Sequence, residues 1–112
     1  MSRGILEVGM AILQRLPVDA ALLDQFCQRW KIERLELFGS ARLDFAAAHD
    51  VDLLASFSLD AEWSLFDHVQ MEEELSELLG RKVDLVSRRA IEESPNALRR
   101  GAILGSAVKV YG

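Results

Sequence analysis

The chain has 112 residues, of which half are apolar and 28% are charged, and its formal net charge at pH 7 is −5. This length and composition predict one globular domain over residues 1–112, with no separate domain to hold a large substrate. The negative charge argues against nucleic acid as a partner, because contacts to phosphates need a basic face.

The single cysteine and the hydropathy pattern bear on the compartment. Cys27 has no second cysteine to pair with, so we expect neither an internal disulfide nor a cysteine zinc cluster, and a buried apolar role is its usual one. No apolar run approaches the roughly 20 residues that a membrane-spanning helix needs, and the N-terminus lacks a signal-peptide pattern. We therefore expect a cytoplasmic protein that has no membrane partner.

The first third of the chain predicts two helices and a strand. Residues 5–16, "ILEVGMAILQRL", have a loosely helical apolar spacing that Gly9 interrupts. Residues 18–30 predict a second helix with one apolar face, formed by Ala20, Leu23, Phe26, Cys27 and Trp30. Residues 32–38, "IERLELF", are rich in branched and aromatic side chains and end at Gly39, which is typical of a strand.

The middle of the chain predicts a strand followed by a long helix. Residues 51–57, "VDLLASF", form the strand, and residues 62–79 form the helix. Asp60 is a candidate cap for the first turn, and Gly80 is a candidate left-handed stop. The apolar face of this helix is expected to include Leu65, Val69, Leu75 and Leu79.

The last third predicts a strand at residues 82–87, a short helical stretch at 95–104 and an edge strand at 107–111. Arg88, Arg89, Arg99 and Arg100 are expected to be solvent-exposed residues that aid solubility, and the alternative is a basic surface for ATP or for an acidic partner. The loop between the strands at 32–38 and 51–57 is too short for a helical crossover. The order of elements therefore predicts an α+β fold, in which a small mixed sheet is covered by helices on one side.

Three aspartates at or within apolar strands are the strongest chemical signal. Asp50 and Asp52 are two residues apart, so in a strand their carboxylates lie on one face while Val51 points to the other. Two such carboxylates repel each other unless a cation lies between them, and a hard divalent ion such as Mg²⁺ fits oxygen ligands. Asp84, inside the apolar strand "KVDLV", offers a third carboxylate.

The same spacing has an alternative reading. Asp50 could cap the end of the loop while Asp52 faces solvent, as acidic residues often do at turns. Asp84 weakens this reading, but spacing alone does not decide between the two. Gly39 and Ser40 add a second signal, because a glycine at a strand end followed by a capping serine can expose backbone N–H groups to a phosphate.

The strand ending in Gly39-Ser40, the strand that begins with Asp50 and Asp52, and the later strand with Asp84 follow one another in an order that is found in a known family. The stretch "LFGSARLDFAAAHDVDLL" (37–54), followed by "LLGRKVDLVS" (78–87), resembles the minimal nucleotidyltransferases (MNT) of the DNA polymerase beta-like superfamily. The resemblance covers residues 17–112 and implies a polymerase beta-like palm fold. It also implies that Asp50, Asp52 and Asp84 are catalytic and ligate Mg²⁺, and that the nucleotide-binding residues are Gly39, Ser40 and Arg42.

The resemblance also implies a reaction and a partner. A nucleoside monophosphate, expected to be AMP from ATP, would pass to a hydroxyl of a partner protein with Mg²⁺ as cofactor. Small members of this family act as antitoxins of HEPN toxins, so a helical HEPN toxin is the expected partner. The pattern leaves open whether the protein forms a homo-oligomer.

Two other functions remain open at this point. The chain could be a decayed nucleotidyltransferase that neutralises a toxin by binding alone. This alternative is favoured by "AAAH" (46–49), which stands where the family usually has a Pro-Asp-Ser turn, so that His49 replaces a small hydroxyl. An enzyme that extends nucleic acid fits the chemistry but not the acidic charge.

Overall fold

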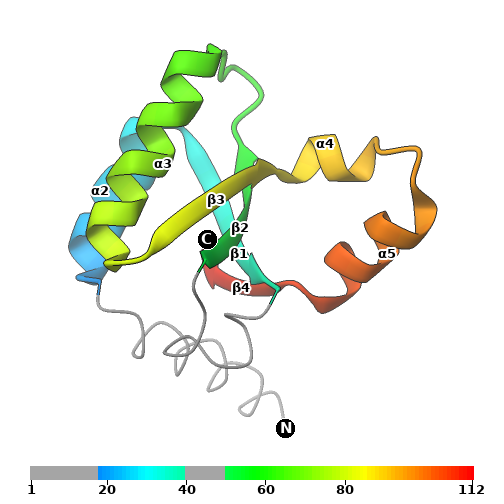
Figure 1. Ribbon diagram of the computed structural model, residues 1–112. Coiled ribbons are helices and arrows are strands. Elements are labelled where there is room, and N and C mark those ends of the chain that lie inside the picture. Colours follow the sequence, from blue (N-terminus) through cyan, green and yellow to red (C-terminus); the bar gives the residue numbers. More distant parts are fainter. Residues whose placement is uncertain (1–17, 40–49) are drawn as a thin grey trace, which may run out of the picture.

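A computed structural model describes residues 18–39 and 50–112 of the chain (Figure 1). The predicted helix at residues 5–16 lies outside this part. The elements occur in the order α2 (Ala20–Arg29), β1 (Ile32–Phe38), β2 (Asp50–Phe57), α3 (Leu65–Leu79), β3 (Lys82–Ser87), α4 (Arg88–Glu92), α5 (Ala97–Ser106) and β4 (Val108–Tyr111).

The four strands form one mixed sheet in the order β3-β2-β1-β4. β1 is antiparallel to both β2 and β4, whereas β2 and β3 are parallel. Parallel neighbours need a long connection, and α3 provides it between β2 and β3. The predicted mixed sheet and the predicted edge position of the last strand are both confirmed.

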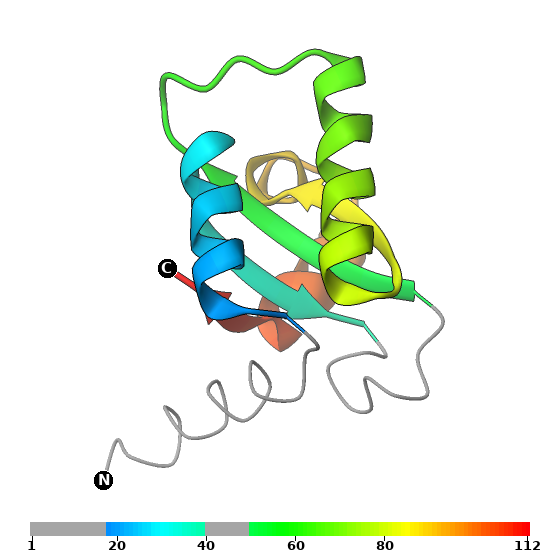
Figure 2. The same cartoon turned by 90° about the vertical axis from the view of Figure 1, so that its left-hand side faces the viewer.

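Helices lie on both sides of the sheet, and the longer helix α3 lies with α2 on one of them. Figure 2 shows α2 and α3 side by side over one face, which confirms the predicted helical layer. Figure 1 shows α4 and α5 on the opposite side. The sequence predicted α5 but not α4, whose five residues are too few to show a helical period. Within the described ranges, no helix combines the length and apolarity needed to cross a membrane.

The hydrophobic core lies between the sheet and the layer formed by α2 and α3. It contains Leu23, Phe26, Cys27, Trp30, Ile32, Leu35, Leu37, Val51, Leu53, Ala55, Met71, Leu75, Leu79, Val83, Leu85 and Val110. Cys27 is buried as predicted, and burial, with a smaller effect of Asp24, raises the pKa of its thiol to about 12. Ala20, the first residue of α2, is exposed, which corrects the prediction; burial on this face begins one turn later, at Leu23.

The start of α3 also corrects the sequence prediction. The helix begins at Leu65, and its N-cap is Ser64 rather than Asp60. The Ser64 hydroxyl accepts a hydrogen bond from the Asp67 N–H at 3.1 Å, and the Asp67 carboxylate accepts one from the Ser64 N–H at 2.9 Å. This reciprocal pair satisfies two N–H groups at the helix terminus. Asp60 instead accepts a hydrogen bond from the Lys31 ammonium at 3.0 Å.

The buried face of α3 is only partly the predicted one. Leu75 and Leu79 are buried together with Met71, whereas Leu65 and Val69 are 80% and 45% exposed. At 3.6 residues per turn, Leu65 and Val69 lie well away from the direction in which Met71 points. The first two turns of α3 therefore present apolar side chains to solvent.

The end of α3 and its side chains protect the edge strand β3. The helix ends at Gly80 with a left-handed φ of 68°, as predicted. The Ser76 hydroxyl accepts a hydrogen bond from the Val83 N–H at 2.9 Å, and the Glu72 carboxylate accepts one from the Leu85 N–H at 2.8 Å. These bonds occupy edge N–H groups that would otherwise be open to pairing with another strand.

Candidate active site

The candidate site lies at one end of the sheet, where β1 ends and both β2 and β3 begin. Asp52 is opposite Phe38 of β1 in the antiparallel pair and opposite Asp84 of β3 in the parallel pair. In-register neighbours place their side chains on the same face, so Asp52 and Asp84 are adjacent carboxylates. The parallel register therefore brings the third carboxylate, Asp84, beside Asp52.

The alternation along β2 separates the core from this site. Val51 and Leu53 are buried in the core beneath α2 and α3. Asp50 and Asp52 point to the other face, where Asp50 is exposed and Asp52 is half-buried. The two aspartates therefore share a face, as their spacing predicts, and that face is the one opposite the main helical layer.

The negatively charged carboxylates at this site repel one another. The pKa of Asp52 is raised above its usual 3.8, mainly because burial disfavours the carboxylate and further because Asp84 and Asp50 are negatively charged neighbours. Three like charges at one sheet end make each further negative charge costly. A bound cation would lower this cost.

The turn after β1 passes directly against Asp52. Gly39 has a φ of 75°, a left-handed conformation that side chains rarely adopt, and a Cβ built on it would lie 2.5 Å from Asp52 Oδ2. Glycine is therefore needed both for the backbone conformation and for the space that the carboxylate occupies. Ser40, Arg42 and His49 lie outside the described residues.

The donor set fits magnesium only in combination with a substrate. In residues 18–39 and 50–112, no three acidic, histidine or cysteine side chains are arranged to hold a metal by themselves. Mg²⁺ is usually held by one or two carboxylates, with substrate phosphates and water completing the shell, rather than by a cage of protein ligands. The oxygen donors of the aspartates suit such a shared site.

A buried ion pair on the same face was missed from the sequence. Glu36 is only 7% exposed, although it is charged, and its carboxylate accepts a hydrogen bond from Arg88 at 2.6 Å. Arg88 lies in α4, so this bond links α4 to β1. Arg88 also lies 3.6 Å from Glu92 and is therefore not the solvent-exposed residue that the sequence predicted. A glutamate within the apolar run "RLELF" is the signal that could have indicated a buried partner.

This ion pair leads to a stability prediction. Replacing Arg88 by leucine should lower the free energy of unfolding by about 3 kcal/mol, because the buried Glu36 carboxylate loses its partner. The double variant Glu36→Met/Arg88→Leu should recover most of this loss, since no unpaired charge remains. Urea unfolding at pH 7 measures both values. An Arg88→Leu loss below about 0.5 kcal/mol, the usual range for surface changes, would contradict the prediction.

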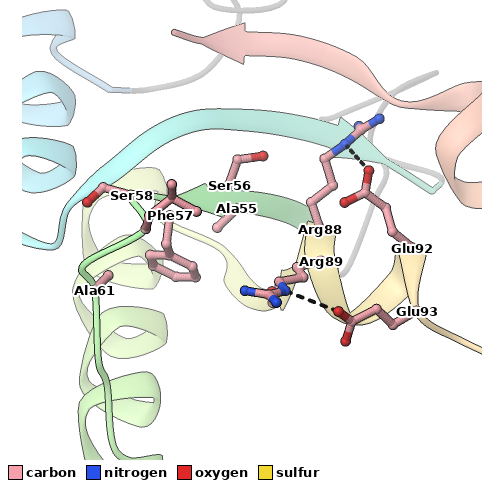
Figure 3. A pocket seen from close by; sticks show the side chains of 11 residues that line it. Ala55, Ser56, Phe57, Ser58, Ala61, Arg88, Arg89, Glu92 and Glu93 are labelled. Carbon is pink, nitrogen blue, oxygen red and sulfur yellow. Dashed lines mark hydrogen bonds and ion pairs between the residues drawn. The ribbon is translucent and has the colours of Figure 1, made fainter.

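A cavity of about 600 Å³ lies at the other end of β2, away from the aspartates (Figure 3). Phe57 forms part of its wall, and α4 contributes two arginines whose charges are matched within the wall. Arg88 lies beside Glu92, and Arg89 donates a hydrogen bond to Glu93 at 3.1 Å. The cavity therefore lacks the concentration of one charge that marks the aspartate site.

Comparison with known proteins identifies the family. The family described as nucleotidyltransferase domain matches residues 20–110, and the chain therefore belongs to it. A Methanocaldococcus jannaschii protein named "Putative protein adenylyltransferase" is 36% identical over 66 residues, which are 58% of this chain and 65% of that protein. The matched region thus spans a little less than two thirds of that relative.

Solved structures agree with this assignment. The structure of a "putative minimal nucleotidyltransferase" is 35% identical, with a TM-score of 0.57 over 79% of this chain and 84% of that chain. A chain in the complex of the tri-AMPylated Shewanella oneidensis HEPN toxin with MNT antitoxin is 17% identical, with a TM-score of 0.56 over 82% and 68%. The latter likeness concerns the fold alone. The predicted nucleotidyltransferase fold and the resemblance to minimal nucleotidyltransferases are confirmed.

Proposed function

We propose that this nucleotidyltransferase transfers AMP from ATP, with Mg²⁺, to a hydroxyl on a partner protein. The observation that carries the proposal is the in-register placement of Asp52 beside Asp84, at the sheet end where the Gly39 turn contacts Asp52. This arrangement gathers carboxylates for a metal next to a turn whose backbone lies close to the same point. Triphosphate chemistry needs both features together.

Each residue has a definite role in this proposal. Asp50 and Asp52 would hold the metal, and Asp84 would complete the acidic set and accept the proton of the attacking hydroxyl. That hydroxyl oxygen forms a bond to the α-phosphorus in line with the bond to the bridging oxygen, which breaks and releases pyrophosphate. Gly39, with Ser40 and Arg42 as proposed from the family pattern, holds the triphosphate. Magnesium, when bound, would neutralise phosphate charge and lower the pKa of the attacking hydroxyl.

The proposed acceptor is a HEPN-type helical toxin, which would make this chain its antitoxin. Two comparisons support this choice. The matched M. jannaschii protein carries the name of a protein adenylyltransferase, and the similar fold from S. oneidensis was solved with an AMPylated HEPN toxin. Asp50 is exposed at this end of the sheet, which leaves the site open to a protein acceptor.

Label transfer tests the proposal directly. The purified chain is incubated with ATP labelled on its α-phosphate, Mg²⁺ and the HEPN-type protein encoded beside it, and we expect label on a hydroxyl of that protein. Chelation of the metal should abolish the labelling. Label that appears equally without this chain would contradict the proposal.

A thermal-shift measurement tests nucleotide binding without a partner. Mg-ATP at about one hundred times its dissociation constant should raise the stability by about 2.7 kcal/mol, because it binds only the folded state. This corresponds to a rise in melting temperature of several degrees. ATP alone should raise it less, since the carboxylates then repel the phosphates.

The alternative of a decayed enzyme has one feature in its favour, the sequence "AAAH" at 46–49. If this alternative holds, the chain neutralises its toxin with no transfer of label and no thermal shift by Mg-ATP. The two measurements above therefore separate the two functions.

A further inference from the structure

The outward face of α3 carries an apolar surface that no other described element covers. Leu65, Phe66 and Val69 are 80%, 87% and 45% exposed. Residues three or four apart are neighbours on a helix, so Val69 lies next to both of the others. Single exposed apolar side chains are ordinary, but a group of large ones marks a surface that binds another molecule. We name these three residues the α3 apolar patch.

A groove runs from this patch along the edge strand β3. A cavity of about 360 Å³ lies between α3 and the edge strand β3, and its wall includes Val69, Glu73, Glu77, Lys82 and Asp84. Val69 belongs to the α3 apolar patch, and Asp84 is the third aspartate of the site. A molecule that fills this groove therefore touches the patch and the edge strand that carries Asp84, while the Asp84 carboxylate itself lies on the face of the sheet opposite α3.

The charges of the groove indicate what it binds. Its wall holds three glutamates and Asp84 against one lysine, Lys82. Glu72 accepts a hydrogen bond from the backbone of β3, but for Glu73 and Glu77 no hydrogen-bond or ion-pair partner exists among the described residues. These two exposed carboxylates are four residues apart, so they lie one turn from each other along the helix.

This pattern fits a basic partner and not a second copy of the chain. A copy would bring the same acidic face against these glutamates, and like charges placed together cost binding energy. A partner helix with apolar side chains followed by lysine or arginine at a four-residue spacing matches both the patch and the acidic turn. Such packing of an amphipathic helix against an apolar surface is a common mode of recognition.

We propose that the groove and the α3 apolar patch bind the acceptor protein through a basic, amphipathic helical segment. The inference rests on the proposed function, in which Asp84 accepts the proton of the acceptor hydroxyl. A segment bound in the groove lies along β3, whose opposite face carries the Asp84 carboxylate, so the docking surface would anchor the acceptor at the sheet edge beside the site and its hydroxyl would reach Asp84 around that edge. Opposite charges would also speed the encounter of the two proteins.

The test compares two double variants with the same change in charge. Glu73→Lys/Glu77→Lys reverses the groove, whereas Glu33→Lys/Glu93→Lys reverses two exposed residues on β1 and next to α4. Binding of the HEPN-type protein is measured by calorimetry, and Mg-ATP binding by thermal shift. We expect the groove variant to bind the HEPN-type protein at least about tenfold more weakly, to lose salt dependence and to keep its Mg-ATP shift. The control variant should match the wild type in all three.

A second pair tests the apolar part. Phe66→Ser should weaken binding of the HEPN-type protein severalfold, whereas Leu98→Ser, at a residue of α5 that is 89% exposed, should not. Wild-type affinity in both the groove variant and Phe66→Ser would overturn the inference while leaving the proposed function intact. A wild-type chain that binds Mg-ATP but neither binds nor labels the HEPN-type protein would contradict both the inference and the proposed function. Sedimentation of the chain alone as a dimer that Phe66→Ser dissociates would show that a second copy occupies the surface, which also overturns the inference.

Discussion

The variant Asp52→Asn is expected to lose nucleotidyl transfer by at least about a thousandfold, because metal coordination supplies several kcal/mol of transition-state stabilisation. Asp52 is the central member of the acidic set, opposite Asp84 in the parallel pair and in contact with the Gly39 turn. An amide keeps the shape but cannot hold the metal as a charged ligand. Transfer of labelled AMP measures the loss.

The same variant should be at least as stable as the wild type. The pKa of Asp52 is raised, so the folded state holds this proton more tightly than the unfolded chain does. As the pH rises from below 3.8 through the raised pKa, this group therefore lowers the free energy of unfolding. The amide side chain of the variant does not titrate, so the variant should gain melting temperature relative to the wild type over that pH range.

Matched variants make the result specific. Asp84→Asn should also lose transfer, whereas Glu33→Gln, at an exposed position on β1, should keep it. Added Mg²⁺ should stabilise the wild type more than Asp52→Asn, since the metal relieves a repulsion that the variant lacks. Transfer by Asp52→Asn at the wild-type rate would contradict the proposed function.

The second large effect is expected from Gly39→Ala. The new Cβ would lie 2.5 Å from Asp52 Oδ2, so either the turn moves or the carboxylate rotates away. Small displacements of a catalytic group cost about a hundredfold in rate, and we expect a loss of that order. The left-handed φ of 75° should cost about 1–2 kcal/mol of stability as well.

Gly80→Ala is the matched control for this change. Gly80 has a similar φ of 68°, but a Cβ there meets nothing within 4 Å. It should therefore lose a similar amount of stability, measured by urea unfolding, with no loss of transfer. Equal activity in both alanine variants would show that the contact between the turn and Asp52 is unimportant.

Much of the fold could be predicted because its signals are local. The apolar runs "VDLLASF" and "KVDLV" predict strands from neighbouring residues alone, and the spacing of Asp50 and Asp52 places them on one face. The cap of α3 was missed although its signal is also local. Asp60 and Ser64 are both good capping residues, and only Ser64 has a carboxylate three residues later, at Asp67, with which it exchanges hydrogen bonds.

The sequence by itself determined the class of the fold, the order of the strands along the chain and the carboxylates of the candidate site. Only the tertiary structure decided that Asp52 lies opposite Asp84, that Gly39 lies against Asp52 and that Glu36 is paired with Arg88. Periodicity records which face a side chain takes within its own element. Register and cross-sheet contacts depend instead on how distant segments pair, and that pairing is set by the packing of the whole core.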